Sequence, residues 1–330
     1  MTRILQPDAS ALREAADLLR AGELVAFPTE TVYGLGADAS SPFAVRRIFE
    51  AKGRPADHPV IVHLRDIDTA RGWARSFPTG AERLARAFWP GPLTLILPRA
   101  QHVDDAVTGG QDSVGLRVPG HRVAQSLLRA FDGAIAAPSA NRFGHVSPTR
   151  AQHVADDLRD AVKLILDGGA SDKGIESTIV AFTTDTPVLL RPGAIGVAEL
   201  TRALGHAPQG ATDDALRAPG RLASHYAPRT PATLLERDAL RAEVSALSDR
   251  DEVVAVLART APVPDEFDGV WIDAPPDVTQ YAHDLYANLR RLDAADADAI
   301  LIEDVPRDTE WIAVRDRLVR ATQGEDDDRD

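Results

Sequence analysis

Short apolar runs alternate with helical patterns through the first 207 residues of the chain. An amphipathic pattern opens it, and apolar runs of strand length then recur between further helical stretches. The expected strands are Leu24–Phe27, Ile61–Leu64, Thr94–Leu97, Gly115–Val118, Ala134–Ala137, Leu164–Asp167, Ser177–Phe182 and Val188–Leu190. The expected helices are Asp8–Leu19, Pro42–Lys52, Gly80–Phe88, Arg122–Phe131, Pro148–Leu158 and Val197–Leu204. This order predicts a mixed α/β sheet covered by helices.

The pattern changes over residues 208–231, which are rich in Pro and Gly and show little apolar periodicity. Such a composition predicts an extended linker and a domain boundary. Strands are expected again at Thr233–Leu235, Val253–Leu257, Val270–Ile272 and Ala299–Glu303, with helices at Ala239–Leu247, Tyr281–Leu292 and Trp311–Ala321. We therefore expect a first domain over 1–207, a smaller α/β domain over 232–324, and an acidic, disordered tail over 325–330.

The stretch from Gly22 to Pro59 combines a buried strand, a Thr-rich turn and a helix. Pro28 ends the strand and leaves Thr29, Thr31 and Tyr33 on a loop at its carboxyl edge, where ligands usually sit in α/β sheets. Ser41 is expected to cap the next helix, with Pro42 at its first position and Gly53 at its end. Lys52 and Arg54 therefore project from a fixed helix end.

Further hydroxyl, amide and guanidinium groups follow other predicted strands. They are Ser113, Arg117, Ser139, Asn141, Ser177, Thr178 and Arg191. These groups bind anions, and no nucleophile is paired with a base among them. The sequence therefore predicts an anion-binding site that works without a covalent intermediate.

Several motifs of this half occur together and in order in one known family. They are PTETVYGLG, the Lys-x-Arg of KGR, HPVIVHL, WPGPLTLIL, GLRVPGH, the Ser-x-Asn of PSAN, ESTIV, LLRPGAI and, in the linker, SHYAP. In these motifs the chain resembles the L-threonylcarbamoyladenylate synthases of the YrdC-domain family, in their longer two-domain form. The resemblance implies a YrdC-like mixed twisted sheet with helices around a concave site, and a Rossmann-like C-terminal domain joined by an extended linker.

The resemblance also implies a reaction. L-Threonine, bicarbonate or CO2, and ATP would condense to L-threonylcarbamoyladenylate with release of pyrophosphate, and a tRNA threonylcarbamoyl transferase would receive the product in a transient contact. Mg2+ is expected with ATP, and no organic cofactor is expected. Pre-aimed cations and amides suit such a transfer, because charge spreads over phosphate oxygens.

The family's functional positions are matched residue by residue. Lys52 and Arg54 are the expected catalytic residues. Threonine is expected against Thr31, His63, Arg117, the backbone near Ala137, and Ser177. ATP is expected against Lys52, Arg54, His58, Ser113, Ser139, Asn141, Ser147, Arg191 and, in the SHYAP segment, Tyr226 with His225 nearby. His58 departs from the family, whose members frequently have Asn there. The linker is expected to fold over the active site as a lid that excludes water.

Each of these residues also has a simple structural reading. Ser147 before Pro148 suits a helix N-cap, and His63 within VIVHL suits a buried histidine. Thr29 and Thr31 suit turn positions, Arg191 suits a surface ion pair, and Tyr33 suits a packing role. Lys52 and Arg54 suit cations at a helix C-terminus. In the C-terminal domain, Trp311, Val314 and Leu318 share one helix face and favour a core, and the missing GxGxxG turn argues against a dinucleotide there. A regulatory, docking or lid-positioning role is expected for that domain.

Charge and composition narrow the function classes. The first 207 residues hold 23 acidic and 23 basic residues, so the whole net charge of −13 lies in the remainder. An acidic second domain repels a phosphate backbone, so stable nucleic-acid binding is not expected. The chain has no cysteine and no apolar run of membrane length, which favours a cytoplasmic enzyme. Two alternatives stay open: a double-stranded RNA binder, and a carbamoyl transferase acting through carbamoyl-adenylate.

Overall fold

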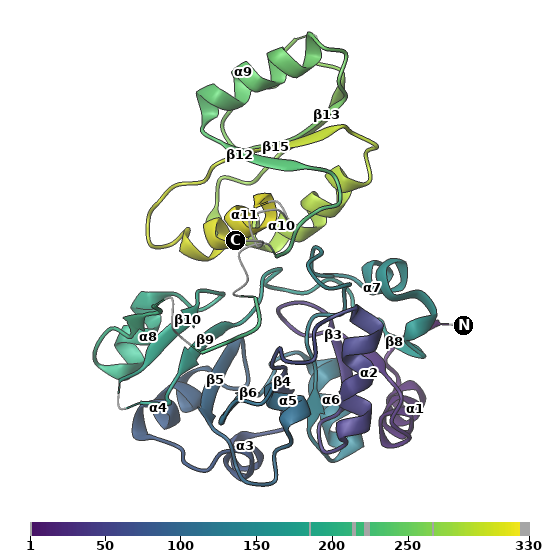
Figure 1. Cartoon of the computed structure of the whole chain (residues 1–330), viewed down its shortest axis with the longest axis vertical. Helices are drawn as coiled ribbons and strands as arrows, with labels where there is room; N and C mark the ends of the chain where they lie inside the picture. Colours follow the sequence, from purple (N-terminus) through teal and green to yellow (C-terminus); the bar gives the residue numbers. More distant parts are fainter. Residues whose placement is uncertain (1, 185, 213–215, 221–224, 266, 324–330) are drawn as a thin grey trace. The chain divides into compact units, whose positions relative to one another are not determined.

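The computed structural model describes residues 2–184, 186–212, 216–220, 225–265 and 267–323. The chain divides into two compact units (Figure 1). The first unit comprises residues 1–143 and 147–221, and the second comprises residues 144–146 and 222–330. No helix in the described part of the chain is long and apolar enough to cross a bilayer.

The first unit is built on one mixed sheet. Its strand order is β1-β8-β2-β3-β7-β4-β6-β5-β9-β10-β11. The strands are β1 (Arg3–Leu5), β2 (Val25–Phe27), β3 (Gly34–Asp38), β4 (Ile61–His63), β5 (Leu93–Pro98), β6 (Ser113–Arg117), β7 (Ile135–Ala136), β8 (Leu164–Leu166), β9 (Thr178–Ala181), β10 (Val188–Arg191) and β11 (Gln209–Gly210). Parallel pairs such as β4 with β6 alternate with antiparallel pairs such as β5 with β6. The predicted mixed α/β fold is confirmed.

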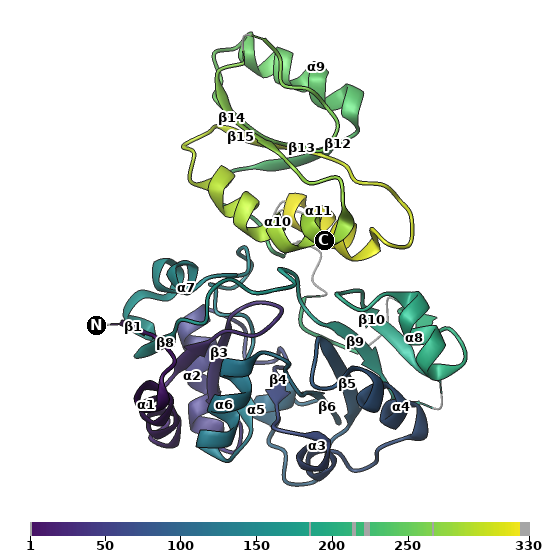
Figure 2. The ribbon, with the colours of Figure 1, turned by 180° about the vertical axis from the view of Figure 1, so that it is seen from behind.

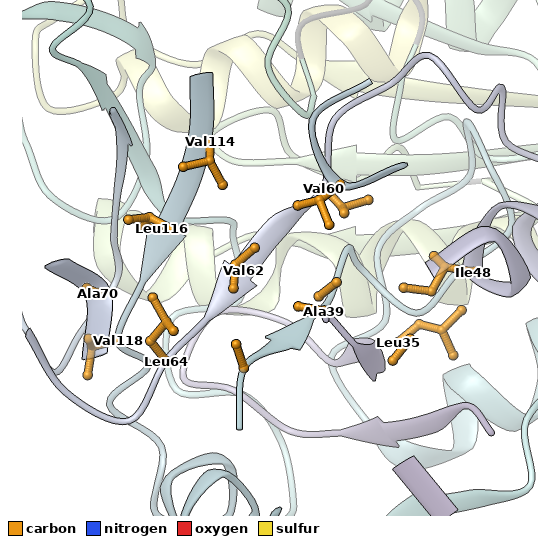
Figure 3. Packing of buried hydrophobic residues seen from close by; sticks show 14 of the residues in the cluster. Leu35, Ala39, Ile48, Val60, Val62, Leu64, Ala70, Val114, Leu116 and Val118 are labelled. Carbon is orange, nitrogen blue, oxygen red and sulfur yellow. The ribbon is translucent and has the colours of Figure 1, made fainter. Parts of the chain in front are cut away.

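Helices cover the sheet unevenly. They are α1 (Ala9–Arg20), α2 (Pro42–Lys52), α3 (Ile67–Trp73), α4 (Thr79–Phe88), α5 (Asp105–Thr108), α6 (Arg122–Phe131), α7 (Ala151–Leu158) and α8 (Val197–Leu204), with a 3-10 turn at Arg159–Ala161. One face of the sheet forms the main core, where Val62, Leu64 and Leu116 pack with Ile48 of α2 (Figure 3). On the other face, α1 and α6 cover only the end that carries Val25 and Phe27.

The face beneath α1 and α6 continues across the central strands, and we call it the site face. At its far end Ile96, Ile179 and Leu190 pack with Ala218 in a second small cluster. Between the two clusters, the register aligns Ile61 with Gly115 and His63 with Arg117. Because side chains alternate along a strand, the site face also receives Thr94 and Ser113. Polar groups from several strands are thus gathered on one face.

The second unit is a smaller parallel sheet in the order β12-β15-β13-β14. Its strands are β12 (Ala232–Leu235), β13 (Val254–Ala258), β14 (Gly269–Asp273) and β15 (Ala299–Glu303), and its helices are α9 (Arg237–Ser248), α10 (Val278–Asp293) and α11 (Ile312–Thr322). Helix α9 lies on one side of this sheet, and α10 and α11 lie on the other (Figure 2). Trp311, Val314 and Leu318 are buried, as a core role predicts.

Local expectations are mostly confirmed, but the strands β1, β3 and β11 and the helices α3 and α5 were not expected, and β11 lies within the predicted linker. Ser41 Oγ accepts from the Ala44 amide, and Gly53 ends α2 in the left-handed region at φ 63°. Strand β3 was not expected, because its Gly-containing sequence lacks a strand pattern. The N-cap reading of Ser147 is wrong: α7 begins at Ala151, three residues after the expected start, and Arg150 is its N-cap residue.

Candidate active site

Three loops of the first unit are held together by backbone hydrogen bonds. The turn over residues 28–33 follows β2, and the amide of Lys173 donates to the Glu30 carbonyl at 2.7 Å. The amide of Tyr33 donates to the Pro148 carbonyl at 2.8 Å. Every residue of this turn is buried, so its polar side chains must find partners inside the site.

A buried ion pair lies at the centre of these loops. Arg117 Nη2 donates to Glu30 Oε1 at 2.8 Å, and both side chains are less than a tenth exposed. Arg117 Nε also donates to the Gly91 carbonyl at 3.4 Å. His63 lies opposite Arg117 on the neighbouring strand, with its ring edge-on to Phe27 at 6.0 Å between centroids. Arg117 and His63, both predicted threonine residues, are therefore neighbours.

Burial and charge set the protonation states of this group. Burial raises the pKa of the Glu30 carboxyl, but the charge and the hydrogen bond of Arg117, with smaller contributions from the backbone amides of Glu30 and Gly120, outweigh burial, so the pKa lies below its usual value. Burial, aided by Arg117, lowers the pKa of His63 to about 3. At neutral pH, Glu30 is thus an anion and His63 is uncharged.

The hydroxyl groups of the turn are oriented by one another. Thr29 Oγ1 lies 2.6 Å from the Val32 carbonyl, which can only accept, so the Thr29 hydroxyl donates there. Thr29 Oγ1 also lies 2.8 Å from Thr31 Oγ1, and its own proton is already used. Thr31 must therefore donate to Thr29. The two threonines thus occupy turn positions, as expected, and their hydroxyl groups have fixed orientations.

Ser177 and Arg191 form a second buried group. Ser177 Oγ lies 2.8 Å from Thr94 Oγ1, and Arg191 Nη2 donates to Ser177 Oγ at 3.1 Å. Arg191 also donates to the carbonyls of Ser177 and Pro219. Arg191 is buried, so the expectation that it forms an ion pair on the surface is wrong.

Lys52 is buried at the end of α2 and holds the loop that follows β7. Its Nζ donates to the carbonyls of Ser139 at 2.6 Å and Asn141 at 2.5 Å, and the Phe143 amide donates back to the Lys52 carbonyl. Burial, with a smaller effect of Arg54, lowers the pKa of Lys52 well below its usual value. Lys52 thus lies in the last turn of α2, as expected for a residue at the helix C-terminus, and it is buried there.

Arg54 and His58 lie on the loop after α2. Arg54 Nη2 donates to the Pro59 carbonyl at 2.9 Å, and its guanidinium lies 5.9 Å from the centre of the Phe49 ring. The His58 ring is edge-on to Phe143 at 5.5 Å between centroids. Burial, and then Arg54, lower the pKa of His58, which favours its neutral form. His58 thus borders the loop that Lys52 holds.

Two further predicted ATP residues of this unit are Ser113 and Ser147, and Ser113 lies at the opposite end of β6 from Arg117. Ser113 lines a small pocket on the site face, which Ile61, Thr94 and Gly115 also line, together with Arg217 and Pro219 of the predicted linker. Ser147 Oγ donates to Glu176 Oε1 at 2.7 Å. Near the threonine residues, the Ala137 amide donates to the Ile61 carbonyl. Ser113 and Arg117 lie at opposite ends of one strand, about 13 Å apart.

Tyr226 and His225 belong to the second unit, and Ser224 lies outside the described residues. The Tyr226 ring packs against Tyr286 at 5.6 Å between centroids, and the Arg317 guanidinium lies 5.6 Å from its centre. The contact of Tyr226 with ATP stays a prediction. Within the described ranges, no three His, Asp or Glu side chains are grouped as ligands for a metal ion.

Comparisons with known proteins cover both units. The family model described as telomere recombination, which represents Sua5, YciO and YrdC proteins, matches residues 17–193. A model described as threonylcarbamoyl-AMP synthase, C-terminal domain, matches residues 195–323. The chain belongs to the Sua5 family. A threonylcarbamoyl-AMP synthase of Pyrococcus abyssi is 41% identical over 94% of each chain, and one of Bacillus subtilis is 39% identical over 95% of this chain and 93% of its own.

Solved structures agree with this membership. The crystal structure of P. abyssi Sua5 complexed with L-threonine has a TM-score of 0.89 and 38% identity, and covers 98% of this chain and 97% of that one. A double-alanine variant of the same Sua5 protein has a TM-score of 0.90. The predicted YrdC-like fold with a C-terminal domain is therefore confirmed.

Reasoning from the sequence missed three buried groups of the site. Glu30 lies between Thr29 and Thr31 in the Sua5-family motif PTETVYGLG, and only its neighbours were singled out. Glu176 and Thr94 were also passed over. For Glu30, the available signal was an acidic residue in the short turn after the fully apolar strand β2, since a buried carboxylate needs a cation or a ligand.

Proposed function

We propose that this chain synthesises L-threonylcarbamoyl-AMP from L-threonine, bicarbonate or CO2, and ATP, with release of pyrophosphate. The observation that carries this proposal is the similarity to threonylcarbamoyl-AMP synthases over nearly the whole length of both chains. The product would supply the threonylcarbamoyladenosine modification of tRNA. A tRNA threonylcarbamoyl transferase is the expected recipient, reached in a transient contact.

The geometry of the threonine end supports this reaction. The guanidinium of Arg117 suits a carboxylate, because Arg presents paired donors where Lys presents a point charge. His63 is neutral and adds no second cation. We propose that threonine lies here, with Thr31, Ser177 and the backbone near Ala137. Its carbamate oxygen then attacks the α-phosphorus of ATP, so the protein supplies alignment and charge rather than a nucleophile, and alignment alone is worth roughly 7–11 kcal/mol.

The ATP end is proposed along Lys52, Arg54, His58 and Ser113, with Arg191, Ser139, Asn141 and Ser147. Lys52 fixes the loop of Ser139 and Asn141 through its hydrogen bonds. A bound triphosphate would bring negative charge to Lys52 and raise its pKa, so the protonated form would prevail with ATP. Mg2+ is proposed to arrive as part of the ATP complex, because phosphates and water are its usual ligands in such sites.

The linker and the C-terminal domain are proposed to serve this site. We propose a catalytic domain over 1–207, a linker over 208–231 and a C-terminal domain over 232–324. The linker is proposed to act as a lid over the active site, with its Tyr226 in contact with ATP. Pro219 already accepts from Arg191 within the first unit, which supports a linker that follows the site face. Tyr226→Phe should raise the KM for ATP and leave the KM for threonine unchanged.

The test is pyrophosphate release by the purified chain with MgATP, omitting threonine or bicarbonate in turn, with mass spectrometry of the nucleotide product. Release that needs both substrates, with threonylcarbamoyl-AMP detected, supports the proposal. Release with carbamoyl phosphate in their place favours the carbamoyl transferase. No release by folded protein, together with salt-sensitive retention of double-stranded RNA, favours the RNA binder and overturns the proposal.

A pair of variants locates the triphosphate. Arg54→Gln should raise the KM for ATP at least about tenfold, since a charge-assisted contact to phosphate is lost. Arg65→Gln is the matched control, because Arg65 is an exposed arginine paired with Asp66 and Asp132. Equal KM values for ATP in both variants would show that Arg54 does not contact the triphosphate.

A further inference from the structure

Glu30 is a buried carboxylate that is only half satisfied. Its side chain is 8% exposed, and Oε1 accepts from Arg117. Oε2 is buried, and although the nearby amides of Glu30 and Gly120 favour the anion, no residue that the structure describes makes a hydrogen bond of normal geometry to Oε2. An ionised oxygen in this position is costly unless a donor reaches it. Its environment therefore indicates a ligand that donates.

The surroundings of Glu30 narrow the chemistry of that ligand. Arg117 makes hydrogen bonds to Glu30 and Gly91 and keeps further N–H groups for an acceptor. His63 is neutral, and its buried Nδ1 has no hydrogen-bond partner within the described residues. The site thus offers one cation and one anion side by side. A zwitterion matches this pair, whereas a simple anion would face the Glu30 carboxylate.

We propose that Glu30 recognises the α-amino group of the substrate, with Oε2 accepting from the ammonium while Arg117 holds the α-carboxylate. This inference rests on the proposed function, since it assumes that the amino acid binds beside Arg117. A carbamate nitrogen keeps one N–H, so the same oxygen serves the substrate before and after carboxylation. Glu30 is then a specificity-determining residue, which selects α-amino acids over other small carboxylates.

A purely structural role makes a different prediction. If Glu30 serves only as the counter-ion of Arg117, its loss changes stability and weakens all carboxylate ligands alike. If Glu30 reads the amino group, its loss acts on ligands that carry an ammonium and spares those that do not. The ligand series therefore separates the two roles.

The first experiment uses the unaltered chain. Calorimetry compares L-threonine with its analogue that carries a hydroxyl in place of the α-amino group. The analogue should bind about 100-fold more weakly, because one partner of a buried charge pair is missing and an anion faces Glu30. Binding of the two within threefold would overturn the inference while leaving the synthase proposal standing. No binding of threonine together with no pyrophosphate release would overturn both.

The second experiment uses Glu30→Gln, which keeps the shape of the side chain and an acceptor for Arg117. Affinity for threonine should fall about 30-fold, and affinity for the hydroxyl analogue should stay level or rise, so the preference for the amine shrinks to below about tenfold. Glu303→Gln, a buried carboxylate of the second unit, is the matched control and should keep the full preference. An unchanged preference in Glu30→Gln would contradict the inference.

Discussion

Each of the two sheets has a buried glutamate near the carboxyl end of a strand. The two carboxylates differ in how many hydrogen bonds they accept from the chain. Glu30, after β2, keeps Oε2 without a partner in the described structure. Glu303, at the end of β15, accepts at Oε2 from the amides of Arg259, Thr260 and Ala261 at 2.6–3.0 Å, and at Oε1 from the Thr260 hydroxyl. One carboxylate is open to a ligand, and the other is closed by the chain itself.

The two carboxylates differ in how much of their hydrogen-bonding capacity the chain itself fills. Ligands of such sheets bind outside the carboxyl ends of the strands, often on backbone amides. In the second unit the Glu303 carboxylate already accepts from the three amides after β13. In the first unit, Arg117 and Glu30 hold charges that are only partly satisfied. A buried charged side chain therefore indicates a ligand site when some of its hydrogen-bonding capacity is unfilled.

The largest effect should follow the loss of Arg117. Arg117→Met leaves the Glu30 carboxylate buried without a cation, so the free energy of unfolding should fall by about 3–5 kcal/mol. Urea denaturation measures it, and the double variant Arg117→Met/Glu30→Gln should recover part of the loss, because no uncompensated charge remains. A single-variant loss below about 1 kcal/mol would show that Glu30 is not buried as an anion.

The next effect concerns the closed carboxylate. Glu303→Ala leaves three amides and the Thr260 hydroxyl without their acceptor, and the free energy of unfolding should fall by about 3 kcal/mol. The KM for threonine should not change. Calorimetric unfolding and steady-state kinetics measure the two quantities. A KM for threonine that rises with this variant would break the contrast between the two units.

A third effect is the pH dependence of stability that His63 of the first unit causes. His63 has a pKa of about 3 in the folded chain against its ordinary value of 6.5, so below pH 6.5 protons favour the unfolded chain and stability falls as the pH falls. This residue alone should remove about 2 kcal/mol between pH 7 and pH 5. Urea denaturation of His63→Asn should show a shallower pH dependence than that of the unaltered chain, and parallel curves would contradict the burial of neutral His63.

The smallest effect tests another carboxylate of the first unit. Ser147→Ala removes the hydroxyl that donates to Glu176, and the free energy of unfolding should fall by about 1 kcal/mol. Ser147→Thr keeps the hydroxyl and is the control. If the KM for ATP also rises in Ser147→Ala, Ser147 belongs to the nucleotide site; an unchanged KM would limit it to supporting Glu176.

Much of the fold was predictable because its signals are local. The capping of α2 by Ser41 and its end at Gly53 depend on residues within a few positions. Strand β3 forms instead because it pairs with β2 and β7. Its Gly-containing sequence has no strand pattern from which this pairing could be predicted. Ser147 has the local pattern of an N-cap, but its hydroxyl is drawn to Glu176, a residue far along the chain.

The candidate site was predictable by residue type and less so by role. Arg117 and His63 were singled out, and the register explains why they meet. That Arg117 is paired with Glu30 depends on a turn that folds back over the sheet, and no spacing in the sequence encodes it. Lys52 likewise gives no sign in the sequence that its ammonium is directed at the carbonyls of Ser139 and Asn141.

The most direct test of the contrast is a crystal structure of the chain with L-threonine. The account predicts one threonine in the first unit, with its carboxylate on Arg117 and its ammonium within about 3 Å of Glu30 Oε2, and no ligand at the amides that Glu303 fills. Threonine bound with its ammonium more than about 4 Å from Glu30, or bound at Glu303, would contradict the account.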